Sequence, residues 1–352
     1  MITNLRLYCY NQETMACEWH HKVFNVNDTG FNDLALEIFH FQYENNPVYK
    51  RYVDALHINI HSINSFNQIP FLPVQIFKSY PVKTTSFIPV ITFQSSGTTE
   101  ILPALHHIKD LAFYETSSRK TFEHFYGSIK TWCFIGLLPS YLERKNSSLV
   151  YMAEQFIKLS GHPDSGFYLN DFEKLYSVIK ELESKKQKTL LLGVTFGLLD
   201  FANRYKMRLT HTCIMETGGM KGRERLGGIG EITRHEVHDI LKQSFGISEI
   251  HSEYGMTELL SQAYSKCDGL YYCPPWMKVL IRDEDDPLLV HVENDINNSH
   301  ISGAINIIDL ANIYSCCFIA TDDVGKLYSN GSFEVLGRLD ESDLRGCSLM
   351  VV

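Results

Sequence analysis

The sequence of 352 residues lacks any apolar run long enough to cross a membrane. Its longest such run, residues 190–201 (LLLGVTFGLLDF), falls short of the roughly 20 residues that a membrane-spanning helix needs. The N-terminus has no basic stretch followed by an apolar core, so the sequence predicts no secretory signal. We therefore expect a cytoplasmic protein with no membrane span.

The sequence also has fewer basic than acidic residues. The 32 Lys and Arg residues are outnumbered by 41 Asp and Glu residues, which gives a formal net charge of −9. A negative protein does not attract a polyanion, so we expect no nucleic-acid partner. Hydrophobic residues make up 44% and charged residues 21%, as in ordinary globular proteins, which excludes a disordered chain.

The nine cysteines include no CxxC pair. Cys267 and Cys273 have no second pair to complete a zinc site. A chain of this size can bury its own core, so free thiols are predicted rather than disulfides. Cys316 and Cys317 lie in an apolar run and are predicted core residues.

Helical patterns and apolar strand-like runs alternate along the chain, which predicts an α/β fold. Helices are expected at residues 31–45, 48–56, 110–126, 170–184, 196–205 and 231–245, with Asn170 and Glu173 capping the fourth of them. Strands are expected at residues 87–93, 132–138, 189–194, 211–215 and 249–253. Two histidines in the last helix, His235 and His238, are one residue short of the HExxH spacing and are predicted surface residues.

After about residue 270 the pattern changes to short β-like runs, at residues 288–292, 303–310, 315–320 and 326–336. A turn at Asn330-Gly331 interrupts the last run. No linker marks a firm boundary. We therefore expect one domain, 1–352, with an α/β subdomain over 1–270, a β-rich subdomain over 271–340 and a tail over 341–352.

Polar loops follow three of the predicted strands. Residues 95–100 (SSGTTE) could cradle phosphate oxygens with hydroxyl and main-chain N–H groups, although no Walker-type Gly-Lys follows. Residues 254–258 (YGMTE) could stack a base, approach a phosphate and hold Mg²⁺. Residues 321–325 (TDDVG) could bind a ribose diol, assisted by an Arg in residues 337–340 (GRLD). Taken singly, each segment could also be an ordinary polar turn or a charged hairpin.

In this order the three segments resemble the adenylate-forming superfamily, from about residue 65 to the end of the sequence. The segments IPFLPVQIFKS, ETGGMKGR, EYGMTELLSQAYS and GRLDESDLRGCSL are similar to the acyl-protein synthetase (LuxE) family. The resemblance implies the large N-terminal-type domain of these enzymes, with mixed sheets flanked by helices and a β-rich end. The sequence ends twelve residues after Asp340, so the mobile C-terminal domain that carries a catalytic Lys is expected to be absent.

The resemblance also implies an ATP and Mg²⁺ site. Its residues would be Ser95, Ser96, Gly97, Thr98 and Thr99 on the β,γ-phosphates, Thr257 on the α-phosphate, Glu258 on Mg²⁺, Tyr254 with Gly255 and Met256 beside adenine, Gly218 and Gly219 lining the same slot, and Asp323 with Arg338 on the ribose.

One departure from the superfamily concerns the phosphate loop. Glu100 stands where the loop usually has Gly, and no Lys follows before Lys109. Lys221 and Arg223 are candidate replacement cations, although a solvated basic turn is an equal alternative.

The implied function is activation of a carboxylic acid, of fatty-acid type, to an acyl-adenylate. Cys347 matches the position of the family's acyl-accepting Cys, and Arg345 could favour its thiolate. An acyl reductase, an acyltransferase or a carrier protein would then be the partner. The alternatives are an acyl- or aryl-CoA (or carrier-protein) ligase, and a degenerate protein that only binds a nucleotide or an acyl group.

Overall fold

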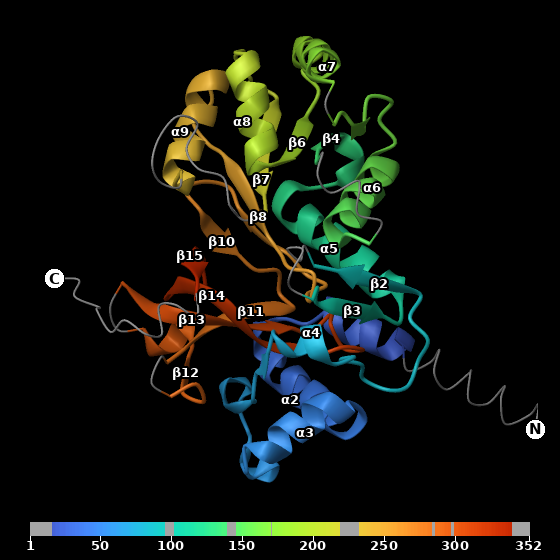
Figure 1. Cartoon of the computed structure of the whole chain (residues 1–352), viewed down its shortest axis with the longest axis vertical. Helices are drawn as coiled ribbons and strands as arrows, with labels where there is room; N and C mark the ends of the chain where they lie inside the picture. The colour runs from blue at the N-terminus through green and yellow to red at the C-terminus, as the bar shows by residue number, and fades with distance from the viewer. Residues whose placement is uncertain are drawn as a thin grey trace, which may run out of the picture.

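The computed structural model describes residues 16–95, 102–138, 146–169, 171–218, 232–283, 286–296 and 299–339. Within these residues, thirteen strands form one mixed sheet, and β2 and β3 form a separate ribbon (Figure 1). The order in the large sheet is β12, β11, β13, β14, β15, β10, β9, β8, β7, β6, β4, β5, with β1 beside β14. A mixed sheet flanked by helices confirms the predicted α/β class.

The helices are α2 (Asp28–Asn45), α3 (Pro47–Ala55), α4 (Ile76–Ser79), α5 (Leu111–Tyr126), α6 (Ser148–Ser160), α7 (Phe172–Ser184), α8 (Thr195–Arg204) and α9 (Arg234–Phe245). The strands are β1 (Leu72–Pro73), β2 (Ile91–Gln94), β3 (Leu105–Ile108), β4 (Cys133–Leu137), β5 (Gly166–Phe167), β6 (Thr189–Val194), β7 (Thr212–Thr217), β8 (His251–Tyr254), β9 (Ala263–Ser265), β10 (Leu270–Tyr272), β11 (Met277–Arg282), β12 (Val290–His291), β13 (His300–Asp309), β14 (Phe318–Tyr328) and β15 (Phe333–Arg338). None of the described helices is long and apolar enough to cross a membrane.

The parallel part of the sheet, β5, β4, β6, β7 and β8, is covered by helices on both faces. Alternate residues of each strand serve the two faces. Ile135 and Leu191 belong to a buried cluster with residues of α7, α8 and α9. Phe134 and Leu190 belong to the other cluster, with residues of α5 and α6. A strand that is buried on both faces has a continuous apolar sequence. For this reason the predicted bounds of β6, residues 189–194, agree with the structure.

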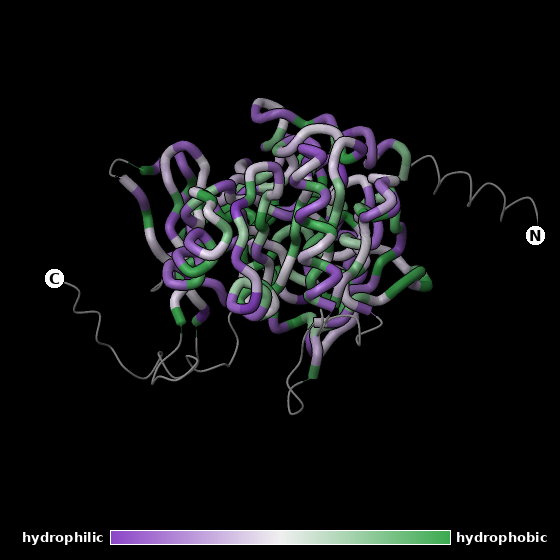
Figure 2. The backbone as a smooth tube through the Cα atoms, turned by 90° about the horizontal axis from the view of Figure 1, so that it is seen from above, coloured by the Kyte–Doolittle hydropathy of each residue, from purple (hydrophilic) through white to green (hydrophobic). Residues whose placement is uncertain are grey.

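From β8 to β12 the neighbouring strands of the main sheet are antiparallel, with β1 added parallel to β14, and this part packs on α2 and α3. The ring of Phe318 on β14 contacts Phe39 of α2 and Tyr49 of α3, with centroids 6.3 and 6.2 Å away. Seen from above, hydrophilic stretches mark outer turns and hydrophobic stretches recur through the interior (Figure 2). Strand β10 pairs with both β9 and β15, so one sheet continues through the expected subdomain boundary, which stays a prediction.

Two local expectations were wrong. The runs predicted at 315–320 and 326–336 are instead one long strand, β14, and the hairpin strand β15, so Asp322 and Asp323 lie inside a strand. Register shifts and Gly325 accommodate this strand, since a Cβ on Gly325 would lie 2.2 Å from the Glu334 carbonyl oxygen. Helix α7 is capped by Asp171, whose side chain accepts from the Lys174 N–H at 3.1 Å. The expected cap Asn170 lies outside the described residues.

A buried amide joins α2 to the loop between β13 and β14. Gln42 is completely buried, and its Nε2 donates to the carbonyls of Ile313 and Asn312 at 2.9 and 3.2 Å. Its Oε1 accepts from the N–H of Cys317 at 2.9 Å. Gln42 therefore satisfies backbone groups that have lost access to water.

We expect Gln42→Met to lower the free energy of unfolding by about 2–3 kcal/mol, because it leaves these buried backbone groups without partners. Chemical denaturation measures the change. Gln187→Met is the control, since the exposed amide of Gln187 donates to the Thr131 carbonyl at 3.0 Å and water can replace it. Equal losses in the two variants would contradict this account.

Candidate functional site

Two of the predicted nucleotide-binding segments, the one that begins at Gly218 and YGMTE, lie at the carboxyl ends of β7 and β8. These strands are parallel neighbours, with Thr217 opposite Glu253. Gly218 follows β7 with a φ of +84°, a left-handed conformation that glycine adopts without strain. Tyr254 ends β8. The carboxyl ends of parallel strands are where open α/β sheets bind ligands, so this edge is the candidate site.

Tyr254, Asp323 and Arg338 meet at this edge. The Tyr254 hydroxyl donates to Asp323 Oδ2 at 2.7 Å, and Arg338 Nε lies 3.3 Å from Asp323 Oδ1. Arg338 is directly opposite Asp323 in the β14–β15 pairing, so the hairpin register creates the contact. The Arg338 guanidinium also approaches Asp322 at 3.7 Å. The structure therefore brings together three residues that the sequence predicted on one nucleotide.

Glu258 is buried beside this group, with 6% of its surface exposed. Burial raises the pKa of its carboxyl; the positive charges of Arg338 and Lys78 oppose that rise, and Asp323 adds to it. The preceding residue, Thr257, is held through its backbone: its carbonyl oxygen is 2.7 Å from His106 Nδ1. A carbonyl can only accept, so the contact needs the ring proton on Nδ1.

Two polar residues that the sequence did not single out fix the segment after Thr257. Asp309, completely buried, accepts from the N–H groups of Leu260 and Ser261 at 2.8 and 2.9 Å and from the Ser261 hydroxyl at 2.6 Å. Asn312 donates to the Glu258 carbonyl at 2.7 Å. A lone polar residue in an apolar run gives no sequence signal, because its partners become neighbours only in the fold.

Glu253, at the end of β8, is a second buried carboxyl. Burial raises its pKa to about 7, although the hydroxyl of Thr217 donates to it and opposes the rise. The chain then bends back over this side chain. A Cβ on Gly255 would lie 2.5 Å from Glu253 Oε1, so a larger residue at this position would displace the Glu253 carboxyl.

A buried acid–imidazole pair stands behind Gly218. Glu216 on β7 accepts from His238 Nε2 at 2.9 Å and from the Thr195 hydroxyl at 2.6 Å. Burial raises the pKa of Glu216, but these two hydrogen bonds outweigh it and the net pKa is lowered. His238 was predicted on the surface and is 3% exposed, so that expectation was wrong. His235, three residues earlier, does point outward, with 86% of its side chain exposed.

Ser95 marks the start of the predicted phosphate loop. Its backbone N–H donates to the Ala104 carbonyl at 3.1 Å, and its hydroxyl accepts from the Ala104 N–H at 2.9 Å, so the β2–β3 ribbon closes the base of the loop. Several predicted site residues lie outside the described residues: Ser96, Gly97, Thr98, Thr99, Gly219, Lys221, Arg223 and Cys347.

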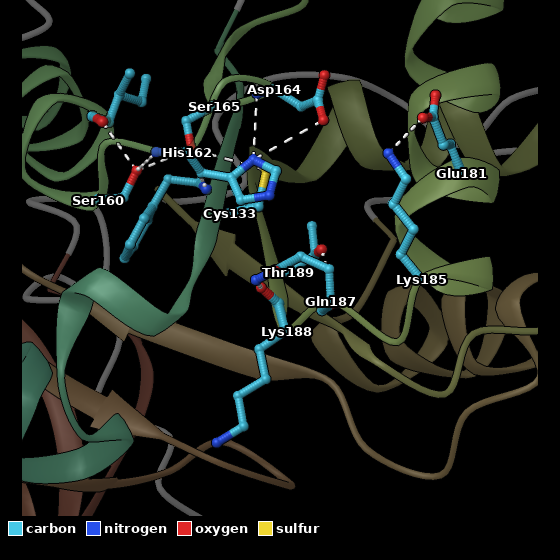
Figure 3. Close-up of polar contacts among 12 residues, drawn as sticks. Cys133, Ser160, His162, Asp164, Ser165, Glu181, Lys185, Gln187, Lys188 and Thr189 are labelled. Carbon is cyan, nitrogen blue, oxygen red and sulfur yellow. Dashed lines mark hydrogen bonds and ion pairs between the residues drawn. The ribbon is translucent and has the colours of Figure 1, made fainter.

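A thiol, two hydroxyls and an imidazole lie close together at the amino end of β4 (Figure 3). Cys133 is completely buried, and burial raises its pKa to about 11. The hydroxyls of Ser160 and Ser165 are 2.9 Å apart, and Ser165 is 3.7 Å from the Cys133 sulfur. His162 Nδ1 accepts from the Asp164 backbone N–H at 3.2 Å. The thiol stays protonated at neutral pH, and the contacts anchor the loop before β5.

Comparison with known proteins identifies the fold. No protein-family model and no curated protein matches the sequence. Among solved structures, ATP-bound MatB from Rhodopseudomonas palustris has a TM-score of 0.51 at 13% identity, over 81% of this chain and 52% of that one. The ATP-bound RpMatB-BxBclM chimera B3 has a TM-score of 0.51 at 14% identity, over 72% of this chain and 50% of that one.

The fold is therefore that of the adenylate-forming enzymes. The chain spans about half the length of the solved structures it matches.

The raised pKa of Glu253 has a consequence for stability. Below about pH 4.5 the carboxyl is protonated in both states, whereas between that pH and about 7 only the unfolded state loses the proton. Stability is therefore lost as pH rises through this window. We expect Glu253→Gln to gain about 3 kcal/mol relative to the wild type across it, measured by denaturation at each pH.

Thr217→Val provides the control for this prediction. It removes the hydroxyl that holds the pKa of Glu253 down, so the pH window of lost stability should extend upward. Parallel pH profiles for the wild type and Glu253→Gln would contradict the assignment.

Proposed function

We propose that this protein activates a carboxylic acid with ATP to form an acyl-adenylate and pyrophosphate. The observation that carries the proposal is the meeting of Tyr254, Asp323 and Arg338 beside the buried carboxyl of Glu258, at the carboxyl edge of the parallel strands. A ribose diol can donate to the Asp323 carboxylate in place of the Tyr254 hydroxyl. The adenylate-forming fold supports the same proposal.

The chemistry of Glu258 fits a magnesium ion. Among the described residues its carboxylate accepts only from its own backbone N–H, and burial raises its pKa. A buried carboxylate with so few donors gains from a divalent cation. Mg²⁺ is commonly held by one or two carboxylates together with substrate phosphates, and Glu258 would be that carboxylate here. Mg²⁺ bound there would neutralise phosphate charge.

The reaction balances without a further reactant. A carboxylate oxygen of the acid attacks the α-phosphorus of ATP, the new acyl–phosphate bond forms, and the bond to the β-phosphate breaks as pyrophosphate leaves. The protein's part is to orient the two reactants and to compensate charge. Asp323 would position the ribose, Tyr254 would lie beside the adenine, and Arg338 would hold Asp323 in place.

The second half of the proposal concerns the acyl group. The Cys347 thiolate would attack the acyl carbonyl, forming a thioester and releasing AMP, while the thiol proton passes to water. The thioester would then supply an acyl reductase, an acyltransferase or a carrier protein. A fatty acid is the proposed substrate, on the resemblance of the YGMTELLSQAYS and GRLDESDLRGCSL segments to acyl-protein synthetases.

Pyrophosphate release tests the first half. With ATP, Mg²⁺ and a panel of aliphatic and aromatic acids, we expect at least one acid to stimulate release. Glu258→Gln should reduce the rate roughly 100-fold, because the charge that would hold the cation is lost. Glu249→Gln, exposed ahead of β8, is the matched control and should keep the wild-type rate. Stimulation by no acid would overturn the enzyme assignment and leave a binding protein.

Acylation of the protein tests the second half. We expect Cys347→Ala to keep acid-stimulated pyrophosphate release but to lose hydroxylamine-sensitive label from a radioactive acid. Cys17→Ala, which removes an exposed free thiol, is the control and should retain the label. Undiminished label in Cys347→Ala would exclude this residue as the acceptor. Acylation of added CoA in its place would identify a CoA ligase.

A further inference from the structure

The segment IPFLPVQIFKS, residues 69–79, resembles known sequences but has no role so far. The structure places it against the candidate site. Its strand β1 runs parallel to β14, with Leu72 opposite Ile319, and the Val74 N–H donates to the Ala320 carbonyl at 2.9 Å. Asp322 and Asp323 follow Ala320 on the same strand. The short helix α4 therefore begins beside the two carboxylates.

Contacts at both ends of the site hold α4. Gln75, the residue before the helix, donates from Nε2 to Asp322 Oδ2. Phe77 packs edge-on against His106, with ring centroids 6.0 Å apart, and His106 contacts the Thr257 carbonyl. The helix thus bridges the Asp322 side of the site and the Thr257–Glu258 side.

Lys78 is one helical turn from Gln75, and residues three apart share a helix face. Lys78 therefore lies on the face of α4 that Gln75 turns toward Asp322. Within the described residues Lys78 makes no hydrogen bond or ion pair. An ammonium so placed is available to a ligand that enters beside Glu258.

Two other described cations, Arg338 and Lys109, already contact other side chains. The Arg338 guanidinium faces the carboxylates of Asp322 and Asp323. Lys109, the first lysine after the phosphate loop, lies 4.2 Å from the centre of the Tyr314 ring and 3.4 Å from the Thr85 hydroxyl. Burial lowers the pKa of Lys109. Lys109 therefore does not replace the lysine that this loop lacks.

We propose that Lys78 binds the β- and γ-phosphates of ATP and stabilises the pyrophosphate leaving group. The inference rests on the proposed function and adds a residue to its site. Asp322 and Asp323 lie beside α4 and Arg338 already faces both, so a polyanion that binds at this edge needs a further cation. An ammonium on a flexible stem suits phosphate as a point charge.

The test compares nucleotides that differ only in their phosphates. We expect Lys78→Gln to weaken binding of MgATP about 10- to 100-fold, as the loss of one charge-assisted hydrogen bond predicts, while AMP binding changes less than about twofold. Lys78→Arg should restore most of the affinity for MgATP. Isothermal titration calorimetry on the full chain measures both nucleotides.

Lys83→Gln, four residues after this segment, is the matched control, because the Lys83 ammonium donates to the Phe87 carbonyl at 3.3 Å. It should bind both nucleotides like the wild type. Equal weakening of MgATP and AMP by Lys78→Gln, at an unchanged melting temperature, would overturn a phosphate contact. The proposal would also be overturned if Lys78→Gln bound MgATP like the wild type while Lys221→Gln lost MgATP binding.

The outcomes separate this inference from the function on which it rests. If the wild type binds MgATP and the Lys78→Gln protein binds it equally well, Lys78 is excluded and acid activation stands. If the wild type binds no nucleotide, both proposals fail. If nucleotide binds but no acid releases pyrophosphate, a Lys78 effect on binding still assigns the phosphate contact.

Discussion

The candidate site depends on one buried carboxylate, Asp309. It accepts four hydrogen bonds, from the N–H groups of Leu260, Ser261 and Ala311 and from the Ser261 hydroxyl. Burial raises its pKa and these bonds oppose the rise. A buried charge is tolerated only when it is fully bonded, so the backbone at 260–261 has one position that satisfies it. That position sets where Glu258 lies relative to the end of β13, which Asp309 forms.

The electrostatic character of the site follows from this placement. Carboxyl groups outnumber cations at this edge of the sheet. Glu258 and Glu253 are buried and have raised pKa values, and Asp322 and Asp323 lie nearby. The charge of Asp323 adds to the rise that burial causes in the pKa of Glu258, so one carboxylate here makes its neighbour harder to ionise. Perturbed carboxyls at a strand edge are typical of functional sites, and a cation-bearing ligand relieves their repulsion. ATP with a divalent ion is a ligand of that kind.

The sequence predicts elements well where one physical factor dominates. Strand β6 was predicted from an unbroken apolar run and the turn before β15 from Asn330-Gly331. The strand bounds that place Asp323 opposite Arg338 were not predicted. His238 was misplaced, because helical spacing gives the face of a residue but not the partner, Glu216, that lets a polar ring be buried. Asp309 and Asn312 were missed for the same reason. Contacts between residues far apart in the sequence decide these positions, and periodicity carries no record of them.

The phosphate loop SSGTTE lacks the lysine that usually follows it in the superfamily that it resembles. Under our proposal, a segment outside the phosphate loop supplies the missing charge at the candidate site. The β1–β14 pairing and the Gln75–Asp322 contact bring α4 there from residues that precede the phosphate loop. Phe77 packs against the same His106 that contacts Thr257, so the position of α4 and that of the YGMTE backbone are coupled through one ring. Under the proposal, charge compensation at this site comes from the packed segments rather than from the loop that resembles the superfamily.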